Sequence, residues 1–91
     1  MLENSATIVN NIQQMRWQDT VKEADEVKVF MALDRPDYTW RTIGGISRQT
    51  GLSEDRVAQI LAKYNLTLTR LSQTPTASGS ALVALINKVG M

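Results

Sequence analysis

The stretch TIGGISRQTGLSEDRVAQILAKY, residues 42–64, decides the fold. Its apolar residues recur at helical spacing on both sides of a short polar segment, Thr50–Ser53. Within that segment Gly51 can take the left-handed backbone conformation that a tight turn requires. We expect Leu52 to point back into the core and fix the turn. The stretch therefore predicts a helix-turn-helix, two helices that cross steeply.

The ends of both helices carry their own signals. Thr42 and Ser53 each stand where a hydroxyl can cap a helix N-terminus, and the dipole of the second helix favours acidic residues in its first turn. Spacing predicts that the second helix, residues 53–64, points four side chains inward, Val57, Ile60, Leu61 and Tyr64. The predicted outward side chains are Glu54, Arg56, Gln59 and Lys63.

Two glycines lie inside the first helix of the motif. Gly44 and Gly45 each cost about 1 kcal/mol there relative to alanine. We expect that close packing against another helix explains them.

A further helix is predicted before the motif. Thr20 and Glu23 have the spacing of a capping box, and Pro36 should end the helix near Asp34. Its predicted apolar stripe is Val27, Phe30, Met31 and Leu33, preceded by Val21 and Ala24.

Residues 6–16 form a separate amphipathic pattern, with Ile8, Ile12 and Met15 at helical spacing. This predicts an N-terminal helical arm over residues 1–18, before a domain over residues 19–91. The arm folds back on that domain, pairs with its twin in a homodimer through Ile8, Ile12 and Met15, or is disordered.

Three segments read as strands. Residues 37–41 are a short stretch of β-prone side chains, and residues 66–72 are rich in leucine and threonine. Turn-forming residues occupy 74–80, so residues 81–87 are favoured as the returning strand of a hairpin. A helix capped by Ser80 also fits residues 81–89, and this alternative stays open.

Composition narrows the function. The chain has 91 residues, the length of one domain, and contains neither cysteine nor histidine. Disulfides, thiol chemistry, the usual zinc sites and histidine-based catalysis are thereby excluded. We expect no enzyme activity, no cofactor and no metal. The start of the chain lacks the pattern of a signal peptide, and no apolar run has the length of a membrane span, so a cytoplasmic protein is expected.

The charges are distributed unevenly. Residues 1–34 carry three basic and six acidic side chains, whereas residues 35–91 carry seven basic and three acidic ones. Five of those seven basic residues are arginines. This asymmetry indicates an anionic partner for the second part of the chain, or ordinary surface charge.

The helix-turn-helix resembles that of winged-helix regulators. The matching positions are Ile43, Ile46, Thr50–Ser53, Val57, Ile60 and Leu61. With the flanking helix and hairpin, the resemblance covers residues 20–87. It implies an α+β, mainly helical winged-helix fold with an extra N-terminal helix. Residues 40–53 also look like small winged-helix modules that accompany bacterial effector and signalling proteins.

The resemblance implies binding of double-stranded DNA, as in a small transcriptional regulator whose helix 53–64 enters the major groove. Carried over, Arg56 contacts guanine and Gln59 contacts adenine. The expected DNA-contacting residues are Arg41, Thr42, Arg48, Ser53, Arg56, Gln59, Lys63 and Arg70.

Two features of the sequence depart from the pattern of a DNA-binding winged helix and favour another class of function. Glu54 and Asp55 offset Arg56 and Lys63 on the recognition helix, and the hairpin loop 74–80 has no basic residue. The alternative is a winged-helix module that binds a protein partner and no nucleic acid.

Single residues outside the motif have plainer interpretations. Trp17 is expected to pack between helices or at a dimer seam, and Trp40 to cover the edge of the core. Asp25 and Glu26 are expected to lie on a solvated face. Asp34 and Asp37 are read as turn residues rather than as a catalytic pair.

Overall fold

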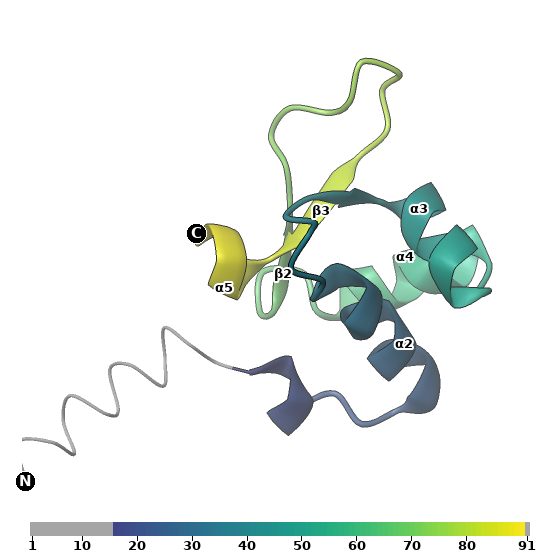
Figure 1. Ribbon diagram of the computed structural model, residues 1–91, viewed down its shortest axis with the longest axis vertical. Helices are drawn as coiled ribbons and strands as arrows, with labels where there is room; N and C mark the ends of the chain where they lie inside the picture. Colours follow the sequence, from purple (N-terminus) through teal and green to yellow (C-terminus); the bar gives the residue numbers. More distant parts are fainter. Residues whose placement is uncertain (1–15, 91) are drawn as a thin grey trace, which may run out of the picture.

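A computed structural model describes residues 16–90 (Figure 1). Helices and one short strand precede a hairpin in the described chain, and a last short helix follows it. The elements in order are η1 (Trp17–Asp19), α2 (Ala24–Leu33), β1 (Arg41–Thr42), α3 (Ile43–Thr50), α4 (Glu54–Lys63), β2 (Thr69–Leu71), β3 (Leu82–Leu85) and α5 (Ile86–Val89). The described part of the chain is thus an α+β fold, and this class prediction is confirmed.

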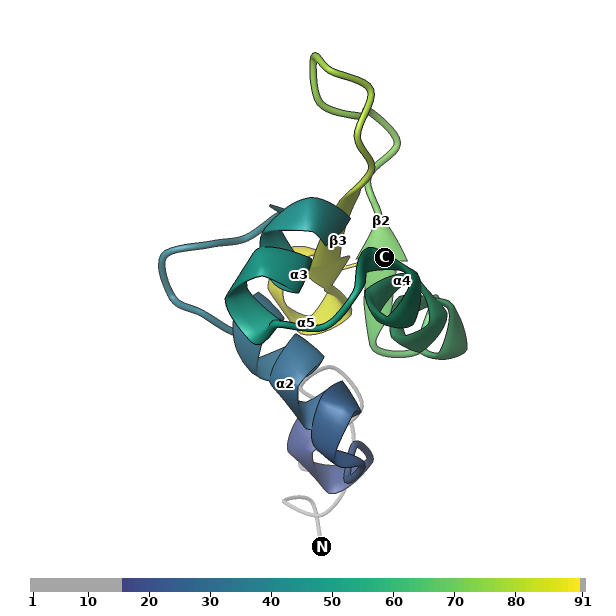
Figure 2. The same cartoon turned by 90° about the vertical axis from the view of Figure 1, so that its right-hand side faces the viewer.

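The three strands form an antiparallel sheet with the order β1-β3-β2. Arg41 lies opposite Val83, and Thr69 lies opposite Leu85. The last of the three strands, β3, is therefore the central one and pairs with both β1 and β2. The long loop between β2 and β3 projects away from the helices in both views (Figures 1 and 2).

The core lies where α2, α3 and α4 meet one face of the sheet. Phe30 is at its centre, fully buried between two other aromatic rings. Its ring centroid lies 5.6 Å from that of Trp17 and 5.2 Å, edge to face, from that of Tyr64. These contacts join η1, α2 and the end of α4. The inward side chains expected on the second helix, Val57, Ile60, Leu61 and Tyr64, are all buried.

The turn between α3 and α4 has the predicted construction. Gly51 ends α3 with φ 79°, in the left-handed region. The carbonyl of Leu52 accepts a hydrogen bond of 2.6 Å from Ser47 Oγ, and its side chain packs on the core. Thr42 Oγ1 accepts from the amide of Gly45, and Ser53 Oγ accepts from that of Arg56. Both caps and the turn are therefore confirmed.

Replacing Gly51 with alanine should lower the free energy of unfolding by about 1 kcal/mol, because a Cβ is disfavoured at this φ. No atom lies within 4 Å of the Cβ position, so the cost is conformational rather than a clash. Urea denaturation of the wild type and of Gly51→Ala measures it. Gly51→Asn is the control, since asparagine tolerates this region better, and it should lose less. Equal losses would contradict the conformational origin.

The start and stripe of α2 differ from the prediction. The capping box at Thr20 is wrong: α2 begins at Ala24, and the carboxylate of Glu23 caps it by accepting from the amide of Glu26. Met31, expected in the stripe, is 60% exposed, while Val29 is fully buried. The buried positions Glu26, Val29, Phe30 and Leu33 repeat every three or four residues, so the core-facing side of α2 leaves Met31 out. The end of the helix at Leu33, with Asp34 as its C-cap, is as predicted.

The strands are shorter than predicted. Of residues 37–41 only Arg41 is in a strand, and residues 66–68 belong to a turn after α4. Residues 81–89, for which a strand and a helix were both considered, contain one of each. Strand β3 ends at Leu85, and helix α5 begins at the next residue.

The explanation expected for Gly44 and Gly45 is wrong. A Cβ on Gly45 would lie 3.2 Å from the capping hydroxyl of Thr42 and 3.3 Å from the Arg41 guanidinium. A Cβ on Gly44 would meet only the side chain of Arg48. Gly45 therefore leaves room for the capping hydroxyl of Thr42 and for the Arg41 side chain, and not for another helix.

Both ends of the described chain are attached to α2. Trp17, expected within the N-terminal arm, is buried, and its Nε1 donates to Asp34 at 2.9 Å. Lys88 Nζ donates to the carbonyls of Leu33, Arg35 and Tyr38. The rest of the predicted arm, with Ile8, Ile12 and Met15, lies outside the described residues. None of the described helices has the length and apolar character to cross a bilayer.

Candidate functional site

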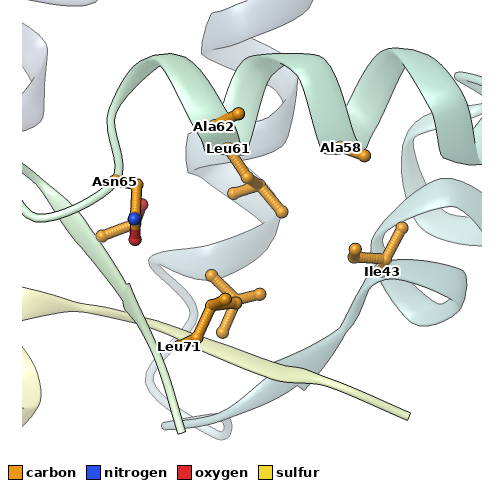
Figure 3. Close-up of a pocket in the computed structure, with 8 residues that line it drawn as sticks. Ile43, Ala58, Leu61, Ala62, Asn65 and Leu71 are labelled. Carbon is orange, nitrogen blue, oxygen red and sulfur yellow. The ribbon is translucent and has the colours of Figure 1, made fainter.

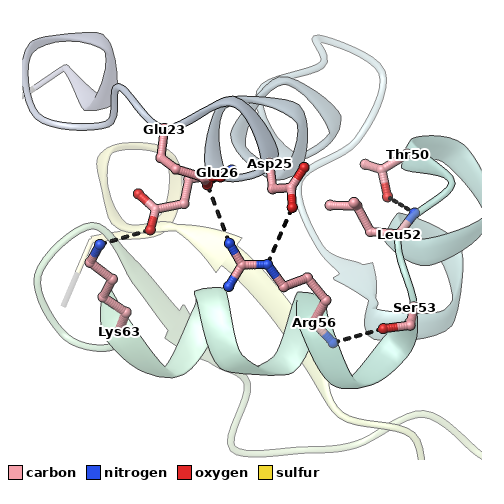
Figure 4. Close-up of polar contacts among 8 residues, drawn as sticks. All are labelled: Glu23, Asp25, Glu26, Thr50, Leu52, Ser53, Arg56 and Lys63. Atoms are coloured by element: carbon pink, nitrogen blue, oxygen red, sulfur yellow. Dashed lines mark hydrogen bonds and ion pairs between the residues drawn. The ribbon is translucent and has the colours of Figure 1, made fainter.

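Most of the basic side chains expected to contact DNA have partners within the domain, and Arg56 is the clearest case. Its Nε lies 3.3 Å from Asp25 Oδ2 and its Nη2 lies 3.4 Å from Glu23 Oε2, both at the start of α2 (Figure 4). Arg56 was expected to point outward, and its side chain is 38% exposed but lies along the surface towards α2. The acidic first part of the chain thus pairs with Arg56 at the surface of the domain.

Lys63 also turns towards α2 (Figure 4). Its Nζ donates to Glu26 Oε2 at 2.7 Å, and Tyr64 Oη donates to Glu26 Oε1 at 2.5 Å. Glu26, expected on a solvated face, is only 5% exposed, so that prediction is wrong. The bond from Lys63, and then that from Tyr64, lower the pKa of Glu26, while burial opposes them. The same bond raises the pKa of Lys63, and the bond to Glu26 together with burial raises that of Tyr64. This cluster links α2 to the end of α4.

Arg41 and Arg70 are also engaged within the domain. Arg41 donates to the carbonyl of Ala32 at 3.1 Å and to the side chain of Gln49, and its guanidinium lies 4.2 Å from the ring centre of Tyr38. Arg70 donates to the carbonyl of Gly90 at 3.0 Å. Four of the five basic residues expected to contact DNA, Arg41, Arg56, Lys63 and Arg70, thus have hydrogen-bond or ion-pair partners within the domain.

The exposed face of α4 has a different character. Its exposed positions besides Lys63 are Glu54, Asp55, Ala58, Gln59 and Ala62. This face therefore presents two carboxylates, an amide and two methyl groups. Arg48, exposed on α3, lines a cleft beside Glu54 and Asp55. Thr42 and Ser53 are occupied as helix caps. Of the predicted contact residues, Thr42 and Arg48 line the same cleft.

A groove lies between α4 and the strands (Figure 3). Its volume is about 240 Å³, and most of its lining is apolar. Leu71 on β2 is 49% exposed at its edge. The lining residues are Ile43, Ala58, Leu61, Ala62, Asn65, Thr69, Leu71 and Val83. Small-molecule pockets usually hold about 300–1,000 Å³, so this groove suits a side chain better than a metabolite.

The groove continues into a polar cleft towards the tip of the hairpin. Ile43 and Ala58 line both. Beyond them the walls carry Arg48, Glu54 and Asp55 and the loop hydroxyls of Thr76, Ser78 and Ser80. We call the groove and the cleft together the α4 furrow. It is apolar near Asn65 and polar near Glu54.

Leu66 adds a second exposed apolar group at the end of α4. It is 61% exposed and has φ 66°, the one positive φ among the described non-glycine residues. A leucine in this conformation costs about 1 kcal/mol or more and leaves its side chain in water. The conformation belongs to the turn after α4, in which the amide of Leu66 donates to the carbonyl of Thr69 and those of Leu68 and Thr69 donate to the carbonyl of Tyr64.

Sequence reasoning missed the α4 furrow, although part of its signal was readable. Ala58 and Ala62 are four residues apart, so they lie on one side of α4 among polar outward positions. The opposite wall, Leu71 and Val83, comes from strands whose position relative to α4 no local pattern fixes.

Within residues 16–90, acidic side chains nowhere gather in the groups of three that a metal ion requires. The chain matches no known protein-family model, no curated protein and no solved structure.

Proposed function

We propose that the chain is a winged-helix module that recognises a protein partner through α4 and the hairpin. The observation that carries this proposal is the exposed face of α4, where two carboxylates line a cleft that shares Ile43 and Ala58 with an open apolar groove. The order of elements, a helix, a short strand, two helices and a hairpin, supports the winged-helix assignment. Protein recognition was the alternative reading of the sequence.

Electrostatics favour this function over DNA binding. Glu54 and Asp55 would face the phosphates of a duplex entered by α4, where like charges repel. Arg56 would first have to leave Asp25 and Glu23, and a cation that is already paired gains little from a second anion. An open apolar groove is, in contrast, a common mark of a protein contact.

DNA binding as a small transcriptional regulator is the competing proposal. The element order favours it, as does Arg48, whose exposed side chain lies beside the hairpin loop. Its expected contacts, Arg41 and Arg70 among them, stay predictions. The cytoplasmic location expected from the sequence also stays a prediction.

An NMR titration of the labelled chain with a mixed-sequence duplex separates the two functions. We expect no shifts in residues 53–64 at low salt, because the exposed face of α4 offers acids to the phosphates. The positive control is the double variant Glu54→Lys, Asp55→Lys, which should acquire shifts that fade as salt rises. If the wild type itself shows salt-sensitive shifts in residues 41–63 and the hairpin, protein recognition through this face is refuted.

A further inference from the structure

We propose that the α4 furrow binds a segment of another protein in which an aliphatic or aromatic residue is followed or preceded closely by arginine or lysine. This inference rests on the proposed function and specifies its partner. The apolar side chain would fill the groove, and the basic side chain would meet Glu54 and Asp55.

The apolar end of the furrow defines the first requirement. Ala58 and Ala62 present only methyl groups, so a foreign side chain can approach the surface of α4 closely. Leu71 and Leu61 supply apolar contacts on either side. A buried apolar anchor in such a pocket typically dominates the affinity of an interface.

The polar end defines the second requirement. Among the described residues, neither Glu54 nor Asp55 has an ion pair or a side-chain hydrogen bond, in contrast to Glu23, Asp25 and Glu26. Arg48 lines the same cleft, but it is within ion-pair distance of neither carboxylate. Two acids against one base leave the cleft negative, which selects a basic side chain.

The geometry of α4 sets the spacing between the two requirements. The middle of the groove, between Ala58 and Ala62, lies about 8 Å along the helix axis from Glu54 and Asp55, at 1.5 Å per residue. An extended segment covers this distance in about two or three residues and a helical one in about five. The anchor and the basic residue should therefore stand two to five positions apart.

The test uses the full chain and a displayed library of random peptides about 12 residues long, enough for about 18 Å as a helix. We expect enriched peptides to share an apolar residue and a basic one at this spacing. With labelled protein, the peptides should shift the amides of Ala58, Ala62 and Leu71.

Two variants and a control sharpen the test. Ala62→Glu should weaken peptide binding at least about tenfold, by blocking the groove. Glu54→Gln with Asp55→Gln should weaken it about two- to fivefold, and only for peptides that keep their basic residue. Ala24→Glu makes the same change on the exposed start of α2 and should leave the affinity unchanged.

Several outcomes overturn the inference. Enriched peptides that lack the basic residue, or that shift α2 instead, refute it while leaving protein recognition intact. If no peptide is enriched and the duplex titration is positive, both proposals fail. If the chain dimerises and Ala62→Glu dissociates the dimer, the occupant is a second copy. If the chain binds the peptides only after residues 1–15 have been deleted, the occupant of the furrow is that segment.

Discussion

Replacing Phe30 with alanine should lower the free energy of unfolding by about 4 kcal/mol, the largest effect we expect from one substitution. The Phe30 ring is fully buried, and it contacts both the Trp17 ring and the Tyr64 ring. Its loss leaves a cavity among η1, α2 and α4 that none of the three can close alone. Urea denaturation followed by tryptophan fluorescence and by far-ultraviolet circular dichroism measures the change.

The matched control for Phe30 is its neighbour. Met31 lies on the same helix but is 60% exposed, so Met31→Ala should change the free energy of unfolding by less than about 0.5 kcal/mol. If the two alanine variants lost similar stability, the assignment of Phe30 as the centre of the core would be incorrect.

The second large effect is expected at Glu26. Glu26→Ala should lower the free energy of unfolding by about 2 to 3 kcal/mol, because the buried Tyr64 hydroxyl loses its acceptor and Lys63 loses its partner. Glu26→Gln keeps an acceptor and should lose less. Asp25→Ala, at the half-exposed neighbouring position, is the control and should lose less than about 1 kcal/mol. A loss at Asp25 equal to that at Glu26 would contradict a central role for the buried carboxylate.

Glu26 should also make the stability depend on acid. Its pKa in the folded chain is below the ordinary value of 4.5, mainly because Lys63 and Tyr64 donate to it. The stabilisation is therefore fully present above the ordinary value and is lost as the pH falls through the lower folded pKa. Denaturation curves between neutral and acid pH should show this loss in the wild type. In Glu26→Gln the free energy of unfolding should fall less as the pH is lowered. If it fell as much as in the wild type, Glu26 would not be the source of the acid dependence.

Local signals account for what the sequence predicted well. A cap needs a hydroxyl three residues before an amide, as at Thr42 and Ser53, and a left-handed turn needs a residue such as Gly51. The helix-turn-helix and the α+β class follow from such signals, and both could be placed without knowing the rest of the chain.

Long-range pairing accounts for what the sequence did not predict. Glu26 accepts a hydrogen bond from Tyr64, 38 positions later, and Arg56 pairs with Asp25, 31 positions earlier. Spacing along α4 makes Arg56 and Gln59 look alike, and only the position of α2 separates them. The furrow depends in the same way on where the hairpin lies.

The central position of β3 has a consequence for how the chain folds as it is made. Strands β1 and β2 have no partner in the sheet until Leu82–Leu85 has been synthesised. Lys88 donates to three backbone carbonyls at the end of α2 and just beyond it. It is synthesised later still, 50 to 55 positions after these partners. During translation α2, α3 and α4 can form their turns and caps early, but their apolar faces stay uncovered until the hairpin is complete. The newly made helices are therefore most exposed to aggregation and to chaperones just before the hairpin emerges from the ribosome.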